Sequence, residues 1–115
     1  MTIEVVSRDD STTRLKISQQ ITFTDVEGNI DPLIRLLGDD VYQNQVLIDM
    51  SGSDYIDSSG VGWLVASHKK FIAAGGRMVL HSFQPEVKKI MTVLRMDHVL
   101  NMSKNEAEAN NLELG

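Results

Sequence analysis

A short apolar run that passes through a polar turn directly into a helix constrains this fold more than any other feature of the sequence. Residues 46–50 are Val-Leu-Ile-Asp-Met, a pattern typical of a strand buried on both faces. The polar residues 51–54 end that strand. Asp57, Ser58 and Ser59 then favour a helix N-cap, because a short side-chain oxygen can accept hydrogen bonds from the unpaired amides of the first helical turn. We therefore expect a serine displayed toward solvent at the positive end of a helix.

The helix is expected to run from Ser58 to about Ala74, where Gly75 and Gly76 end it. At about 100° per residue, its inner face would hold Val61, Leu64, Val65, His68, Phe71 and Ile72. Its outer face would hold Gly62, Trp63, Ala66, Lys70 and Ala73. Trp63 is thus expected to point away from the core, beside small residues that leave room for a partner. The alternative is a tryptophan half-covered by a loop of its own chain.

The flanking segments supply further strands and helices. Residues 3–7 and 13–17 are β-rich and joined by a turn, which predicts an antiparallel hairpin. Residues 77–82 predict a strand, and residues 99–102 predict a short edge strand. Between them, Pro85 opens an amphipathic helix over residues 86–94, in which Met91 is expected to fill the core. Ser103 with Glu106 forms a capping box for a last helix that ends near Leu112.

The segment between residues 24 and 40 has two competing helix starts. Thr24 with Glu27 spells a capping box, whereas Asp31 followed by Pro32 is the arrangement that a proline in the first helical position prefers. We expect a loop or loose turn over residues 24–29 and a short helix from Asp31 to about residue 37, closed by Gly38.

Strands that alternate with helices imply parallel pairing in the middle of the sheet, whereas the first hairpin must be antiparallel. The 115 residues, 42% of them apolar, suffice for one domain with a core that needs neither metal nor disulfide. The predicted fold is a single α/β domain, residues 1–115, with a mixed β-sheet, an N-terminal antiparallel hairpin and helices packed mainly on one face.

Composition narrows the possible functions. The absence of cysteine fits a reducing cytosol and excludes disulfides, thiol catalysis and thiolate zinc sites. A net charge of −5 disfavours nucleic acid or an anionic membrane surface as the main partner. Neither a leader nor an apolar run long enough for a bilayer is expected, so the default compartment is the cytoplasm.

Metal and catalytic sites are not expected. His68, His81 and His98 show no metal-ligand spacing, and His68 is expected to be a partly buried, hydrogen-bonded histidine on the inner helix face. Residues 60–62, Gly-Val-Gly, lack the rest of a dinucleotide or P-loop motif. A nucleophile elbow around Ser58 would need glycine at the position that Ile56 occupies.

Four features occur in one order along the chain: the apolar strand, the sequence Asp-Ser-Ser-Gly-Val-Gly at residues 57–62, the Gly75-Gly76 helix stop and the strand at residues 77–80. Together they resemble the STAS family, specifically the bacterial anti-anti-sigma factors, or anti-sigma factor antagonists. The resemblance covers nearly the whole chain. It implies that Ser58, directly after the aspartate, is phosphorylated by a cognate anti-sigma serine kinase with a histidine-kinase-like ATPase fold. The unphosphorylated form would bind that kinase and free a sigma factor, and a serine phosphatase would reset the cycle. ATP would belong to the kinase, so the chain itself needs no cofactor.

Two interpretations of Ser58 remain open from the residues themselves. As a plain N-cap, Ser58 would only stabilise its helix by about 1 kcal/mol. As a phosphate site, it would gain up to about two negative charges where the helix dipole tolerates them, so the fold would survive while the displayed surface changes sign. The resemblance favours the phosphate site. The expected partner-binding residues are Asp57, Ser58, Ser59, Gly60, Gly62, Trp63 and Ala66.

A second functional class also stays open. The chain could be a STAS scaffold or a regulatory subunit of a transport or signalling assembly, in which Ser58 is only a cap and Trp63 packs in a permanent interface. The sequence also departs from the family at residues 19–22, where it has Gln-Gln-Ile-Thr and many members carry Gly-Glu-Leu-Asp. If that segment helps to dock a partner, this difference in sequence affects which partner the chain binds.

Overall fold

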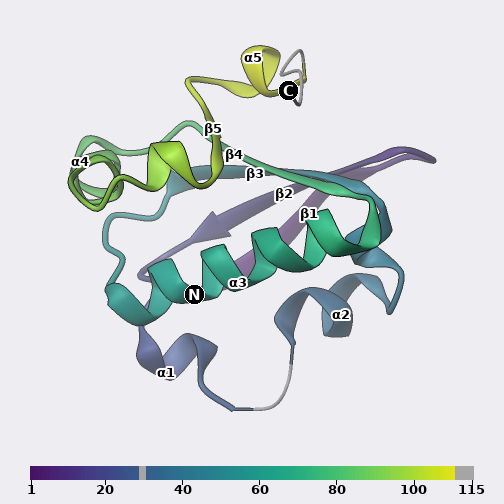
Figure 1. The fold of residues 1–115 in the computed structure, drawn as a ribbon, viewed down its shortest axis with the longest axis horizontal. Helices are drawn as coiled ribbons and strands as arrows, with labels where there is room; N and C mark the ends of the chain where they lie inside the picture. Colours follow the sequence, from purple (N-terminus) through teal and green to yellow (C-terminus); the bar gives the residue numbers. More distant parts are fainter. Residues whose placement is uncertain (29–30, 111–115) are drawn as a thin grey trace.

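The structure is a computed structural model that describes residues 1–28 and 31–110. In this part of the chain, five strands form one sheet in the order β1-β2-β3-β4-β5 (Figure 1). The strands are β1 (Thr2–Arg8), β2 (Thr12–Ser18), β3 (Gln45–Gly52), β4 (Arg77–His81) and β5 (Asn101–Ser103). β1 pairs antiparallel with β2, and every other neighbouring pair is parallel. The predicted mixed sheet with an N-terminal hairpin is confirmed.

Most helices cover one face of this sheet. The helices are α1 (Phe23–Val26), α2 (Pro32–Leu37), α3 (Ser58–Ala74), α4 (Pro85–Val93) and α5 (Glu106–Asn110), with 3-10 turns η1 (Val41–Gln43) and η2 (Met96–His98). Figure 1 shows α1, α2 and α3 together on one side of the sheet and α5 on the other. None of the described helices has the length and apolar character that a membrane span requires.

The alternation of side chains along β3 explains why the helices cover the two faces of the sheet unequally. Successive side chains of a strand point to opposite faces, so Val46 and Ile48 enter the main core with α3 and α4, whereas Leu47 lies on the other face. There Leu47 packs with Val79 and with Ala109 of α5 in a small separate cluster. Met91 of α4 is fully buried in the main core, as predicted.

The predicted start of α2 is correct. The Oδ1 atom of Asp31 accepts hydrogen bonds from the amides of Leu33 (2.9 Å) and Ile34 (3.2 Å). Its Oδ2 atom accepts from the Tyr42 hydroxyl (2.5 Å) and from the Lys70 ammonium (3.0 Å). Asp31 therefore caps α2 and also joins it to η1 and α3.

The loop predicted for residues 24–29 is wrong in part, because the one-turn helix α1 begins at Phe23. The Asp25 carboxylate reaches back to Thr22, accepting from its amide at 2.9 Å and from its hydroxyl at 3.0 Å. The capping pair is thus Thr22 with Asp25, rather than Thr24 with Glu27, and it starts a helix too short to leave an apolar periodicity. Residues 29–30, also part of that prediction, lie outside the described residues.

The predicted cap of the last helix is also wrong. Ser103 lies within β5, and the Asn105 side chain instead accepts the Glu108 amide at 2.9 Å. The Glu108 carboxylate in turn accepts the Lys104 amide at 3.1 Å. Asparagine is as good an N-cap as serine, so the start of α5 shifts along the chain. The predicted helix end near Leu112 lies outside the described residues.

Candidate functional site

Asp57 is the N-cap residue of α3. Its backbone is extended, with φ −97° and ψ −179°, and its Oδ1 atom accepts the Gly60 amide at 2.9 Å. Ser58 is therefore the first helical residue, and its side chain is exposed, whereas Ser59 is half-buried. The interpretation of Ser58 as the plain N-cap is wrong, because the aspartate before it satisfies the first turn.

The Asp57 carboxylate also accepts a hydrogen bond from a second helix. The Oδ2 atom of Asp57 accepts the amide of Phe23, the first residue of α1, at 3.0 Å. One negative charge thus lies at the starts of two helices, where the unpaired amide hydrogens carry partial positive charge. The position of α1 beside the Ser58 turn depends directly on this shared acceptor.

A short parallel bridge fixes the same two segments. Ile21 and Ile56 are bridge partners, and both are almost completely buried. The Ile21 amide donates to the Tyr55 carbonyl at 3.0 Å, and the Asp57 amide donates to the Ile21 carbonyl at 3.1 Å. Residues 19–22, where the sequence departs from the family pattern, therefore lie against the turn that holds Ser58.

Gly60 packs closely against its own chain, and its predicted role in partner binding stays a prediction. It is buried, and a Cβ atom there would lie 2.5 Å from the Ile21 carbonyl oxygen and 2.7 Å from Cγ1 of Ile56. Only glycine lets α3 approach the bridge so closely. Gly62 and Ala66 are exposed, as predicted, and a Cβ atom on Gly62 would meet nothing within 4 Å among the described residues.

The buried face of α3 is rotated relative to the predicted one. Ser67 is 2% exposed and Gly60 is also buried, whereas Ile72, predicted to be inside, is 64% exposed. Close backbone approach at Gly60 turns this flank inward, and apolar periodicity does not record such an approach. Trp63 lies on that flank, so it is half-buried and packs against the main core.

The prediction that Trp63 points away from the core is therefore wrong. Lys70, about two turns further along the same flank, bonds to Asp31 at the start of α2, which shows that this flank faces the chain's own α2 region. The alternative interpretation is correct in that Trp63 is half-buried within its own chain, but the indole packs against the main core and not under a loop.

Two exposed aromatic side chains were missed from the sequence. Phe23 is 57% exposed at the start of α1, and Tyr55 is 45% exposed two residues before Asp57. The Phe23 amide donates to the Asp57 carboxylate, and the Tyr55 carbonyl accepts the Ile21 amide. The signal available in the sequence was Tyr55, an aromatic residue two positions before Asp57. Ser58, Gly62 and Ala66 are also exposed, so the segments that form the turn display aromatic and small side chains.

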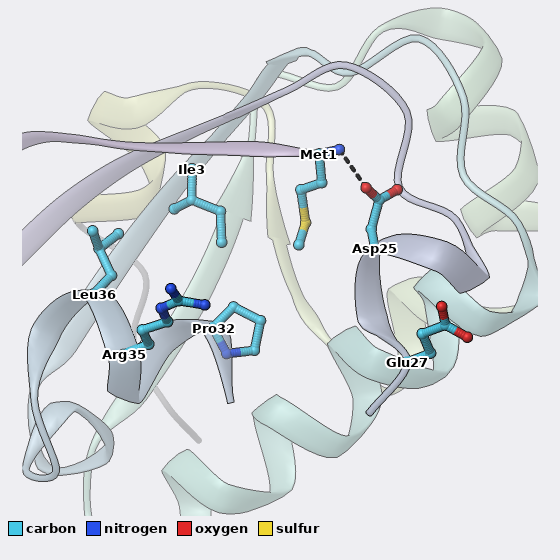
Figure 2. Close-up of a pocket in the computed structure, with 7 residues that line it drawn as sticks. All are labelled: Met1, Ile3, Asp25, Glu27, Pro32, Arg35 and Leu36. Atoms are coloured by element: carbon cyan, nitrogen blue, oxygen red, sulfur yellow. Dashed lines mark hydrogen bonds and ion pairs between the residues drawn. The ribbon is translucent and has the colours of Figure 1, made fainter. Parts of the chain in front are cut away.

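A separate hollow lies on the other side of α1, with a volume of about 530 Å³. Figure 2 shows its lining residues, which are Met1, Ile3, Asp25, Glu27, Pro32, Arg35 and Leu36. The Met1 amino group lies 2.6 Å from Asp25 and, with the Thr22 amide, holds the pKa of that carboxyl below its usual range. No residue of the Ser58 turn lines this hollow, so it is distinct from the candidate site.

Two of the three histidines, His68 and His81, are buried, whereas the His98 side chain is exposed. Burial lowers the pKa of His68, and its Nδ1 atom has no hydrogen-bond partner among the described residues, so the expected hydrogen bond is not found at that atom. Burial also lowers the pKa of His81, although Asp49 and Glu106 act in the opposite direction, and its Nδ1 lies 2.8 Å from the Ser82 hydroxyl. Within residues 1–28 and 31–110, no three acidic, histidine or cysteine side chains gather as a metal site would require.

The sheet order and the strand–turn–helix at Ser58 match a known family. The family model described as the STAS domain matches residues 3–109. The chain belongs to the STAS domain family. No curated protein sequence matches this STAS domain.

Solved structures share the fold of this STAS domain at low sequence identity. A Thermotoga maritima protein assigned as an anti-sigma factor antagonist is 17% identical, with a TM-score of 0.67 over 96% of this chain and 91% of that chain. The anti-sigma factor antagonist SpoIIAA in its unphosphorylated form is 18% identical, with a TM-score of 0.62 over 96% of each chain. The Bacillus cell fate determinant SpoIIAA in its phosphorylated form is 17% identical, with a TM-score of 0.61 over 97% of this chain and 98% of that chain. The predicted α/β fold class is confirmed.

Alanine substitution at the two glycines of α3 tests the packing of the site. Gly60→Ala is expected to lower the free energy of unfolding by about 1–3 kcal/mol, because the added methyl group overlaps Ile21 and Ile56. Gly62→Ala is the matched control in the same helix and is expected to raise it by up to about 1 kcal/mol. Chemical denaturation measures both. Equal effects of the two substitutions would contradict the close approach at Gly60.

Trp63, the only tryptophan of the chain, reports its own surroundings. Its fluorescence maximum is expected to lie between those of buried and water-exposed tryptophan, and Trp63→Ala is expected to cost about 1–3 kcal/mol of stability because part of the indole packs on the core. Ile72→Ala, in the same helix but exposed, is expected to change stability by less than about 0.5 kcal/mol. Fully red-shifted emission with unchanged stability would show that the indole lies outside the core.

Proposed function

We propose that this STAS domain is an anti-sigma factor antagonist whose binding to an anti-sigma serine kinase is switched by phosphorylation of Ser58. The proposal rests on one observation: Asp57 and Ser58 have different roles at the turn. Asp57 caps α3 and also accepts the first amide of α1, whereas the Ser58 hydroxyl is exposed at the helix start. Similarity in fold to SpoIIAA, which is known in unphosphorylated and phosphorylated forms, supports the same interpretation.

The physical effect of phosphorylation follows from this position. A phosphate on Ser58 would lie at the start of the 17-residue helix α3, where the helix dipole tolerates an anion. It would also add up to about two negative charges beside the Asp57 carboxylate. The surface around Phe23, Tyr55 and Gly62 would thus keep its shape but become strongly acidic. A partner that fits the unphosphorylated surface would then be repelled by the added charge.

The roles of the partners follow the same scheme. The unphosphorylated protein would bind the kinase and so release a sigma factor, phosphorylation would release the kinase, and a serine phosphatase would restore the first state. The kinase would hold the ATP, and this domain would act in the cytoplasm as a regulator without catalysis or a cofactor of its own. Within this scheme, the half-buried Trp63 is a support for the surface, and the exposed Gly62 and Ala66 contact the kinase.

The two neighbouring serines provide a matched test of the proposed site. On incubation with candidate anti-sigma kinases and ATP, the wild type and Ser59→Ala are expected to gain one phosphate, and Ser58→Ala none, because only Ser58 is fully displayed. Intact mass and peptide mapping give the readout. Phosphorylation of Ser58→Ala to the wild-type extent would refute the assignment. Stable complexes with no phosphate transfer by any such kinase would favour the scaffold alternative.

A further inference from the structure

A groove between α4 and β5 is separate from the Ser58 turn. Its volume is about 690 Å³, and no residue of the turn lines it. Lys88 and Thr92 of α4 line one side, and Met102 of β5 with Lys104 lines the other. Phe83, just before α4, also lines it. The proposed phosphorylation does not use this part of the molecule.

The floor of the groove is apolar and fixed. Met102 pairs in register with Leu80, which is fully buried in the main core, so Met102 is on the helix-covered side of the sheet. Phe83 and Met102 are both partly buried and pack against that core. Lys88 and Thr92 are four residues apart and therefore lie on the same face of α4. An apolar side chain from outside would meet a preformed surface here.

The groove follows an open edge of the sheet. β5 is the last strand in the sheet order, so among residues 1–28 and 31–110 one edge of its backbone has no neighbouring strand. Such edges bind extended peptide segments by main-chain hydrogen bonds, and adjacent pockets select the side chains of the peptide. Met102 belongs to the edge strand, and Met102 and Lys104 both line the groove.

The charged side chains that line the groove carry a net charge opposite in sign to that of the chain. The whole protein has a net charge of −5, yet two of the three charged residues that line the groove, Lys88 and Lys104, are cations. Lys88 and Lys104 are exposed on the two sides of the groove. Asp97, also in the lining, interrupts the positive rim. This mixed rim and the net negative charge suit a peptide with spaced carboxylates better than a continuous polyphosphate chain.

We propose that this groove binds an extended acidic segment of a partner protein. An apolar side chain of the segment would cover Phe83 and Met102, and carboxylates on either side of it would bind Lys88 and Lys104. Exposed apolar side chains at the end of α4 and after η2 extend the surface beyond the groove; these are Val93 (72%), Leu94 (47%) and Val99 (43%). Because Ser58 is not part of the groove, binding there is independent of its phosphorylation.

The test uses a short, end-blocked peptide in which glutamate and leucine alternate, titrated into the ¹⁵N-labelled full chain. Amide signals of Met102, Lys104 and the Lys88 turn of α4 are expected to shift. The double variant Lys88→Glu, Lys104→Glu should bind about tenfold more weakly, because two exposed charge pairs are reversed. The double variant Lys69→Glu, Lys89→Glu has the same net charge and alters exposed lysines outside the groove, so it should bind like the wild type.

Each other outcome would overturn the proposal. Unshifted groove amides at saturating peptide would show that no acidic segment binds there. Equal weakening in both double variants would show attraction by net charge alone. Equal binding of a peptide with glutamine in place of glutamate would remove the role of the lysines. Tighter, groove-dependent binding of a single-stranded oligonucleotide or of anionic lipid vesicles would assign the groove to a different class of partner.

Discussion

The carboxylate of Asp57 accepts hydrogen bonds from the first turns of two helices, and the arrangement of the candidate site depends on it. One oxygen holds the Gly60 amide of α3 at 2.9 Å, and the other holds the Phe23 amide of α1 at 3.0 Å. Such charge-assisted bonds are stronger than neutral ones. Asp57 accepts one amide at each helix start, and the Ser58 beside it is exposed, so a structural residue and a displayed residue are neighbours in the motif.

Close backbone packing then makes the surroundings of Ser58 a single unit. Gly60 lets α3 lie against the bridge between Ile21 and Ile56, and this bridge holds α1 beside the turn. A partner would therefore meet a surface built from two segments far apart in the sequence. A charge added at Ser58 would change the potential of the whole surface while the core beneath it stays packed. This coupling explains how a switch can alter binding and leave the fold intact.

Apolar periodicity predicted the strands, α3 and α4 well, because burial of side chains largely decides those elements. The errors occur where backbone contacts or single side-chain bonds decide the structure. The flank of Trp63 turned inward because a glycine allowed close approach, and α1 was missed because a one-turn helix held by Asp25 and Asp57 has no periodicity. Phe23 was missed as a surface residue for the same reason. The exposed place of Ser58 at the start of α3 was predicted correctly because its motif is local in the sequence.

The most direct measurement compares the unphosphorylated protein with the protein phosphorylated at Ser58, in one calorimetric titration against the anti-sigma kinase and one thermal melt for each form. The melting temperatures should agree within a few degrees, because the phosphate lies at a tolerant helix start. The phosphorylated form should bind at least about thirtyfold more weakly, since an unmatched charge in an interface costs roughly 2 kcal/mol or more. Equal affinities of two folded forms, or unfolding on phosphorylation, would contradict a charge switch on an unchanged fold.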